Sequence, residues 1–313
     1  MRTGCLRNSF LWTERRRKGM ILLSVLLVSL FLVSASIGFA VFARRTLRRF
    51  DREERSFSAR MTTDVVLESA KLLLTLCPDD AHSPGDEFFA PRNFFFPDVN
   101  VHVRLSLVPL NDKIPINNLF LPDGKTLRTE LAGPWAKLWK EAGAEYLENI
   151  VLDFLDKDGD PRLGGNEDPF FLNRSLYSLR ELLLVPGMRP EILSGSIGRP
   201  GLEAMASLFS SGKINFNTAT PLVLSLLDGL DMSVALDIER TRERKPLSSI
   251  GDLSRIPFFP SSSIPRLMNI IAFTSDWFEA VSEVFFPDGD SRVIKVILRK
   301  NTSSWETVRW EEL

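Results

Sequence analysis

The strongest hydrophobic pattern lies near the N-terminus, where residues 20–43 carry no charge and are mostly apolar. As a helix this segment would be about 36 Å long, which is enough to cross a bilayer core of about 30 Å. The segment is too long for the core of a signal peptide, and Arg44 and Arg45 follow it where a small-residue cleavage site would lie. The pattern predicts a membrane-spanning helix.

The predicted helix continues beyond the membrane segment. No proline occurs before Pro78, and Gly38 is the only glycine between Met20 and Cys77. The second half is amphipathic, which indicates that one face packs on a folded domain. Its apolar positions include Val65, Val66, Leu72, Leu73 and Leu76. We therefore predict one helix over residues 20–77.

Alternation of apolar and polar residues predicts strands at both ends of the remaining chain. The predicted strands are residues 99–107, 277–286, 292–300 and 305–310. The region between the first and second of these strands is mostly helical in pattern, for example at 134–155 and 220–227. The sequence therefore predicts a small sheet interrupted by an inserted helical block.

Composition and charge narrow the possible functions. The chain has 313 residues, of which 44% are hydrophobic and 25% charged, as in ordinary globular proteins. Residues 1–19 hold six of the 39 basic residues and one of the 40 acidic residues, so the rest has a net charge of −6. This balance is not typical of nucleic-acid-binding proteins. Two histidines and two cysteines are too few for most nucleophilic sites or for a disulfide framework, and we predict no enzymatic activity.

A cluster of carboxylates indicates a cation site. Its members are Asp153, Asp156, Asp158, Asp160 and Glu167. The last four occupy places one, three, five and twelve of an EF-hand-like register, and hard oxygen ligands spaced in this way suit calcium. Pro161 stands at place six, where an EF-hand needs glycine, so we expect an irregular calcium loop. The alternative is a solvated acidic turn that caps the preceding helix.

The segment 214–240 resembles a helix-hairpin-helix, a motif whose hairpin amides bind DNA phosphate. Asp231 stands where a second glycine would let phosphate approach. Residues 213–255 hold six basic and six acidic residues, so the segment has no net attraction for a polyanion. We predict a role in protein interaction, with Asn215, Asn217 and Thr218 as turn and capping residues.

The N-terminal residues resemble a processing signal. A basic run ends in Gly19 directly before the apolar segment, which begins at Met20. This arrangement resembles the leader of type IV pilins and type II secretion pseudopilins, in which a prepilin peptidase cuts after the glycine. The fifth mature residue of these families is usually a glutamate that pairs with the terminal amine of the next subunit toward the tip, but here it is Ser24. An unpaired carboxylate in hydrocarbon is unfavourable, so a subunit with nothing above it should lack one.

The chain as a whole resembles the K class of minor pseudopilins in type II secretion systems. The segments that carry the resemblance are 107–119, 156–158, 165–167, 178–188 and 214–219. The resemblance implies an α+β fold in which a pilin-like N-terminal helix packs on a small antiparallel sheet and a large all-α domain of SAM-like, helix-hairpin-helix type is inserted. The implied divisions are a leader at 1–19, the helix at 20–77, the first pilin-like part at 78–115, the inserted domain at 116–275 and the C-terminal strands at 276–313.

The resemblance also implies a function. The chain would be cleaved between Gly19 and Met20, methylated on the new amine and anchored in the inner membrane with its bulk in the periplasm. It would form, with the I and J minor pseudopilins, the tip complex that initiates and caps the pseudopilus for protein export, and its other partners would be the major pseudopilin and the prepilin peptidase. Calcium would be structural.

Two other interpretations stay open. The first is a membrane-anchored periplasmic DNA receptor that uses the helix-hairpin-helix, and the second is a single-pass scaffold whose leader is never processed. Basic residues flank both ends of the membrane segment, so charge alone does not fix its orientation.

Overall fold

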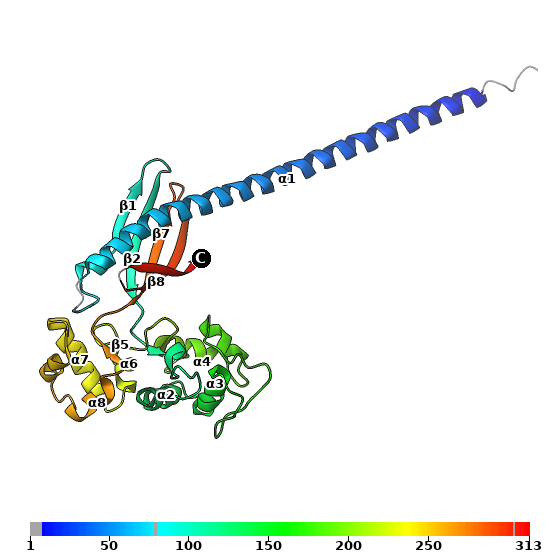
Figure 1. The fold of residues 1–313 in the computed structure, drawn as a ribbon. Helices are drawn as coiled ribbons and strands as arrows, with labels where there is room; N and C mark the ends of the chain where they lie inside the picture. Colours follow the sequence, from blue (N-terminus) through cyan, green and yellow to red (C-terminus); the bar gives the residue numbers. More distant parts are fainter. Residues whose placement is uncertain (1–7, 78–79, 303) are drawn as a thin grey trace, which may run out of the picture. The chain divides into compact units, whose positions relative to one another are not determined.

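The structure is a computed structural model that describes residues 8–77, 80–302 and 304–313, with side chains from residue 20 onward (Figure 1). The chain forms two compact units, Met1–Arg60 and Met61–Leu313, which are treated separately below. Helix α1, Asn8–Leu76, begins in the first unit and ends in the second. The long helix predicted from the sequence is thus confirmed.

The apolar segment of the first unit packs against nothing within the described residues. Its large hydrophobic side chains are exposed, and among the described residues α1 is the one helix long and apolar enough to cross a membrane. Its serine hydroxyls are satisfied inside the helix, because Ser24, Ser29 and Ser36 donate to the carbonyls four residues earlier at 2.8–2.9 Å. Such internal bonding is what a helix needs where lipid offers no partner.

The second unit contains an antiparallel sheet in the order β1-β2-β7-β8-β9 (Figure 1). The strands are β1 (Arg92–Phe96), β2 (Val101–Pro109), β7 (Trp277–Phe285), β8 (Ser291–Lys300) and β9 (Trp305–Glu312). Four of them correspond to predicted strands. The pattern did not predict β1, because Phe94–Phe96 are three consecutive aromatic residues without alternation.

The last part of α1 packs on this sheet. Its buried face consists of Thr63, Val66, Leu67, Ala70 and Leu74. The hydroxyl of Thr63 shares a buried hydrogen bond of 2.8 Å with that of Ser282 on β7. In register, Ser282 lies between Leu105 on β2 and Ile294 on β8, which are also buried, so this face of the sheet carries the packing.

A helical block is inserted between β2 and β7, as predicted. Its helices are α2 (Thr129–Glu141), α3 (Glu148–Leu155), α4 (Pro190–Ser194), α5 (Leu202–Met205), α6 (Pro221–Leu226), α7 (Met232–Arg244) and α8 (Ile264–Leu267). Two short parallel pairs join each end of the block to its middle: β3 (Ile114–Pro115) pairs with β4 (Ala206–Ser207), and β5 (Ile214–Asn215) pairs with β6 (Ile271–Ala272). The 3-10 helices of the second unit are η1 (Glu87–Phe89), η2 (Ile116–Asn118), η3 (Glu145–Leu147), η4 (Leu179–Leu184), η5 (Ile250–Arg255) and η6 (Ser261–Ser263).

One hydrophobic core spans the block from Ile114 to Ile271. Its largest fully buried side chains include Trp135, Trp139, Phe154 and Phe216. The single helix predicted over 134–155 is two helices, because Gly143, with φ +66°, interrupts it between α2 and α3. The predicted helix at 220–227 corresponds to α6, whose N-cap hydroxyl, that of Thr220, accepts from the amide of Val223 at 3.3 Å.

Buried amide side chains join the block to the segments that enter and leave it. Asn215 donates to the carbonyl of His82 at 3.1 Å, and the Nδ1 atom of His82 accepts from the amide of Ser275 at 2.8 Å. Asn217 bonds both backbone groups of Leu247, at 2.8 and 2.9 Å. The two asparagines therefore connect segments distant in sequence, beyond the local turn role predicted for them.

Candidate metal centre

Two carboxylates lie where helix α3 meets the acidic loop, by which we mean residues 156–167. Asp153 lies in the last turn of α3 and Asp156 directly follows the helix. Both side chains are fully buried. A buried carboxylate is strongly unfavourable unless it is hydrogen-bonded or paired, so the fold of this loop depends on what surrounds these two groups.

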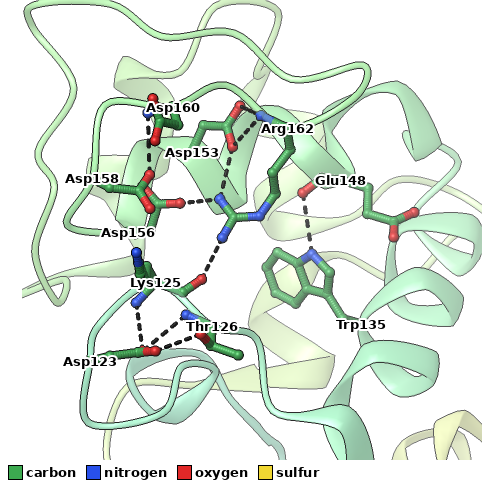
Figure 2. A network of polar contacts seen from close by, with 10 residues as sticks. All are labelled: Asp123, Lys125, Thr126, Trp135, Glu148, Asp153, Asp156, Asp158, Asp160 and Arg162. Carbon is green, nitrogen blue, oxygen red and sulfur yellow. Dashed lines mark hydrogen bonds and ion pairs between the residues drawn. The ribbon is translucent and has the colours of Figure 1, made fainter.

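Arg162 supplies the counter-charge (Figure 2). Its Nη1 atom donates to Oδ1 of Asp153 at 2.9 Å and also to Asp156. Its backbone amide donates to Oδ2 of Asp153 at 3.1 Å, so both oxygens of that carboxylate are bound. The Nη2 atom donates to the carbonyl of Lys125 at 2.7 Å, which ties the acidic loop to the hairpin at residues 120–127.

Three carboxylates form a cluster beside this arginine. Asp156, Asp158 and Glu167 each offer an oxygen, and these oxygens lie within 4.8 Å of one another. Oδ1 of Asp156 and Oε1 of Glu167 are buried and accept no hydrogen bond within the described residues. Two buried oxygens without a partner, next to a third carboxylate, are a donor set that suits a hard cation.

The electrostatics of the cluster are unfavourable without a cation. Burial raises the pKa of Asp156 above its ordinary value, against the opposing effect of its bond to Arg162. Burial also raises the pKa of Glu167, and the charges of Asp156, Asp153 and Asp158 add to the effect. Both raised pKa values indicate that nearby positive charge and hydrogen bonds do not fully offset the cost of burying these two negative charges.

The other two predicted ligands lie beside the cluster rather than in it. Asp153 faces Arg162 with both oxygens, as described above. Asp160 is exposed, and its backbone amide donates to Oδ1 of Asp158 at 3.3 Å (Figure 2). The structure therefore brings together three of the five predicted residues.

Sequence analysis did not find the residues that support the cluster. Arg162 stands within the acidic run, and the close approach of the loop to α3 needs Gly165, where a Cβ atom would lie 1.9 Å from Oδ2 of Asp153. The hairpin at 120–127 is far away in sequence. Its Asp123 accepts from the hydroxyl of Thr126 and from the amides of Lys125 and Thr126, and these bonds lower the pKa of Asp123 to about 2.

The segment that resembles a helix-hairpin-helix forms α6, a short turn and α7. In the turn, Gly229 has φ +78° and faces the protein, since a Cβ atom there would lie 1.9 Å from Oγ of Ser263. Asp231 is the N-cap of α7, and its Oδ1 atom accepts from the amide of Val234 at 2.9 Å. This geometry does not suit phosphate, because a carboxylate already occupies the helix N-terminus.

The predicted processing site lies at the limit of the description. Gly19 is in α1, in the part where side chains are outside the described residues, and Met20 is exposed. The leader residues 1–7 also lie outside the described residues.

Comparisons with known proteins found similarity both in sequence and in fold. No family model matches the chain. The type II secretion system protein K of Dickeya chrysanthemi is 26% identical over 157 residues, which are 47% of this chain and 43% of that protein. The match therefore spans less than half the length of the relative.

Among solved structures, a chain in the crystal structure of the GspK-GspI-GspJ complex from the type 2 secretion system of enterotoxigenic Escherichia coli has a TM-score of 0.65 and 16% identity. The similarity covers 84% of this chain and 99% of that chain, so nearly the whole of that fold is present here. The chain is thus similar in sequence to a type II secretion system K protein and similar in fold to a chain of the complex that contains one.

Proposed function

We propose that this chain is a non-catalytic minor pseudopilin of the K class, which forms the tip of a type II secretion pseudopilus with the I and J subunits. The observation that carries the proposal is the insertion of a complete helical block between two neighbouring strands, β2 and β7, of a sheet that packs on a long apolar helix. The similarity to nearly the whole length of a chain from a complex of three such proteins supports it.

A tip position follows from two physical features. Ser24 carries no charge, and its hydroxyl is satisfied by the carbonyl of Met20 at 2.9 Å, so this position offers no carboxylate to the amine of a subunit above it. A folded block from Ile114 to Ile271 would also be repeated along the fibre if the subunit were stacked. Both features suit a subunit that ends a filament.

The partner surface we propose is an exposed apolar stripe on the last part of α1. It consists of Met61, Val65, Leu72 and Leu76, each more than half exposed. The spacings of four, seven and four residues place these side chains on one face, opposite the face that packs on the sheet. Such a stripe fits the apolar face of another helix, as in the packing of N-terminal helices from the I and J subunits.

The proposed topology is a single span of the inner membrane with the second unit in the periplasm. After cleavage between Gly19 and Met20, residues 20–43 would form the span. The helix then carries ion pairs suited to an aqueous environment, such as Arg49 with Glu53 at 2.9 Å.

Calcium is the structural ion we propose for the acidic loop. Asp156, Asp158 and Glu167 would hold it, because they provide clustered hard oxygens, two of which are buried and accept no hydrogen bond from the described part of the chain. Bound calcium would supply positive charge that offsets their mutual repulsion. The residues would then fix the loop against the end of α3, which adds stability to the helical block.

Co-purification tests the proposal. The full-length chain should retain the I and J pseudopilins of the same secretion system after detergent extraction, and Leu72→Glu should lose them because it puts a charge in the stripe. Met268→Glu is the matched control, since it puts the same charge on an exposed apolar side chain of the helical block. Failure of the wild-type chain to retain either partner, or its occurrence along the whole length of purified fibres, would contradict the proposal.

A further inference from the structure

We propose that Arg162 is a built-in cation of the acidic loop. Its charge keeps the loop folded without metal and restricts calcium to the carboxylates of Asp156, Asp158 and Glu167. The part that concerns calcium rests on the proposed function, whereas the pairing of Arg162 with Asp153 does not. The inference changes the ligand set expected from the sequence, because it assigns Asp153 to the arginine.

Two separate parts of the chain, α3 and the hairpin at 120–127, hold the arginine in place (Figure 2). Asp153 of α3 accepts from its side chain at 2.9 Å and from its amide at 3.1 Å. In the hairpin at 120–127, the carbonyl of Lys125 accepts at 2.7 Å, and the ring of Phe120 lies 5.4 Å from Cζ. Its side chain is only 23% exposed. This many contacts is typical of a fixed structural group rather than a mobile surface side chain.

Charge explains why the loop needs such a group. Asp153 and Asp156 are both fully buried and only three residues apart, so without a counter-charge they would repel each other where water cannot screen them. Arg162 bonds both carboxylates with the same Nη1 atom. It therefore supplies positive charge to Asp153 and Asp156 whether or not a metal ion is bound.

The same geometry divides the oxygens between arginine and metal. Both oxygens of Asp153 and Oδ2 of Asp156 bond to Arg162. Oδ1 of Asp156 and Oε1 of Glu167 are buried and accept nothing within the described residues. The oxygens left for a cation are thus Oδ1 of Asp156 and the carboxylate oxygens of Asp158 and Glu167.

The test uses the full chain in detergent micelles, with melting followed by tryptophan fluorescence in chelator and in calcium. Arg162→Gln should lower the melting temperature in chelator by roughly 10 °C, because it leaves Asp153 and Asp156 buried without their counter-charge. Adding Asp153→Asn to this variant should recover part of that loss, since it removes one of the two buried unpaired charges and the repulsion between them. Arg174→Gln is the matched control, because Arg174 pairs with Glu181 at 3.0 Å in the same block, outside the acidic loop.

Calcium titration by calorimetry completes the test. Arg162→Gln should bind calcium on the order of tenfold more tightly than the wild-type chain, because a fixed positive charge near the ion is gone. The Arg174→Gln control should bind it as the wild type does.

The outcomes separate the two proposals. If Arg162→Gln melts in chelator as the wild type does, or if Asp153→Asn brings no recovery, the built-in cation is wrong. If Arg162→Gln loses calcium binding that the wild type has, the division of oxygens is wrong. If the wild-type chain shows no calcium effect at all, the calcium proposal fails, while the chelator experiment still decides the role of Arg162.

Discussion

The hydroxyl groups of Thr63 and Ser282 form a buried hydrogen bond of 2.8 Å that joins α1 to β7, the middle strand of the sheet. Thr63 is fully buried and Ser282 is 1% exposed, so water cannot replace either partner. A polar pair in an otherwise apolar contact sets the position of the helix along the strand, because a shift of one turn would leave both groups unsatisfied.

A double-mutant cycle tests this pair. Thr63→Val and Ser282→Ala should each lower the free energy of unfolding by about 1–3 kcal/mol, because each leaves a buried hydroxyl without a partner. The double variant should lose less than the sum of the two, measured by denaturant unfolding. Thr75→Val is the control, since the hydroxyl of this exposed threonine donates within its own helix, to the carbonyl of Lys71. Additive losses would show that the hydrogen bond contributes little.

The sequence was sufficient for the long helix and for four of the five strands of the sheet, because these elements have regular apolar periods and no internal breakers. It was not sufficient for β1, whose three consecutive phenylalanines have no alternation. The inserted block was predicted from both the pattern and the family resemblance. The break at Gly143 was not predicted, because a glycine in a helical pattern is often tolerated.

The acidic loop shows a different limit. Carboxylate spacing indicated a cation site, but only three of the five residues lie together. Asp153, which lies outside the cluster, pairs with Arg162, one of many arginines in the chain. Arg162 also donates to the backbone carbonyl of Lys125. Neither feature has a sequence pattern, because both depend on how the hairpin at 120–127 meets the end of α3.

Two glycines of the acidic loop provide a matched pair for stability. Gly165→Ala should lower the free energy of unfolding by about 2 kcal/mol or more, because the new methyl group would lie 1.9 Å from the carboxylate of Asp153 and the loop must move. Gly159→Ala should change it by no more than about 0.5 kcal/mol, since nothing lies within 4 Å of a Cβ atom there. Denaturant unfolding in chelator measures both. Equal effects would show that the approach of the loop to α3 is not tight.

Removal of the Asp158 and Glu167 carboxylates should abolish the stabilisation of the fold by calcium. At a hundred times its dissociation constant, calcium should stabilise the wild-type chain by about 2.7 kcal/mol, seen as a rise in melting temperature. The double variant Asp158→Asn with Glu167→Gln should show no rise, because it removes two of the three clustered oxygens. Asp160→Asn should retain the rise. An unchanged rise in the double variant would place the metal elsewhere.

The pH dependence of stability should reveal the capping box of η5. The Asp252 carboxylate accepts from the amides of Ser248 and Ser249 at 2.8 and 3.0 Å, and bonding to Ser248 foremost lowers its pKa from 3.8 to about 2. Because the pKa is lower in the folded state, the stabilisation is present above pH 3.8 and is lost as the pH falls toward 2.

Asp252→Asn should therefore reduce the free energy of unfolding by about 1 kcal/mol at pH 7, as expected for the loss of a helix cap. The difference between wild type and variant should shrink as the pH is lowered from about 4 to about 2. Urea unfolding at a series of pH values measures it. A difference that stays constant over this range would mean that the charge of Asp252 is not responsible.

Processing at the N-terminus is the prediction that most directly separates a pseudopilin from an ordinary membrane scaffold. In the leaders that residues 15–20 resemble, the peptidase cuts after the glycine. Gly19→Val should therefore leave the precursor uncut, whereas the wild-type chain should begin at Met20 with a methylated amine, as mass spectrometry of the intact protein would show. Gly38→Ala is the control, because Gly38 lies inside the apolar segment with open space around it and its substitution should not affect cleavage. A wild-type chain that keeps residues 1–19 would exclude assembly into a pseudopilus, because the positive charges of the leader would then remain at the end of the helix that has to enter the fibre.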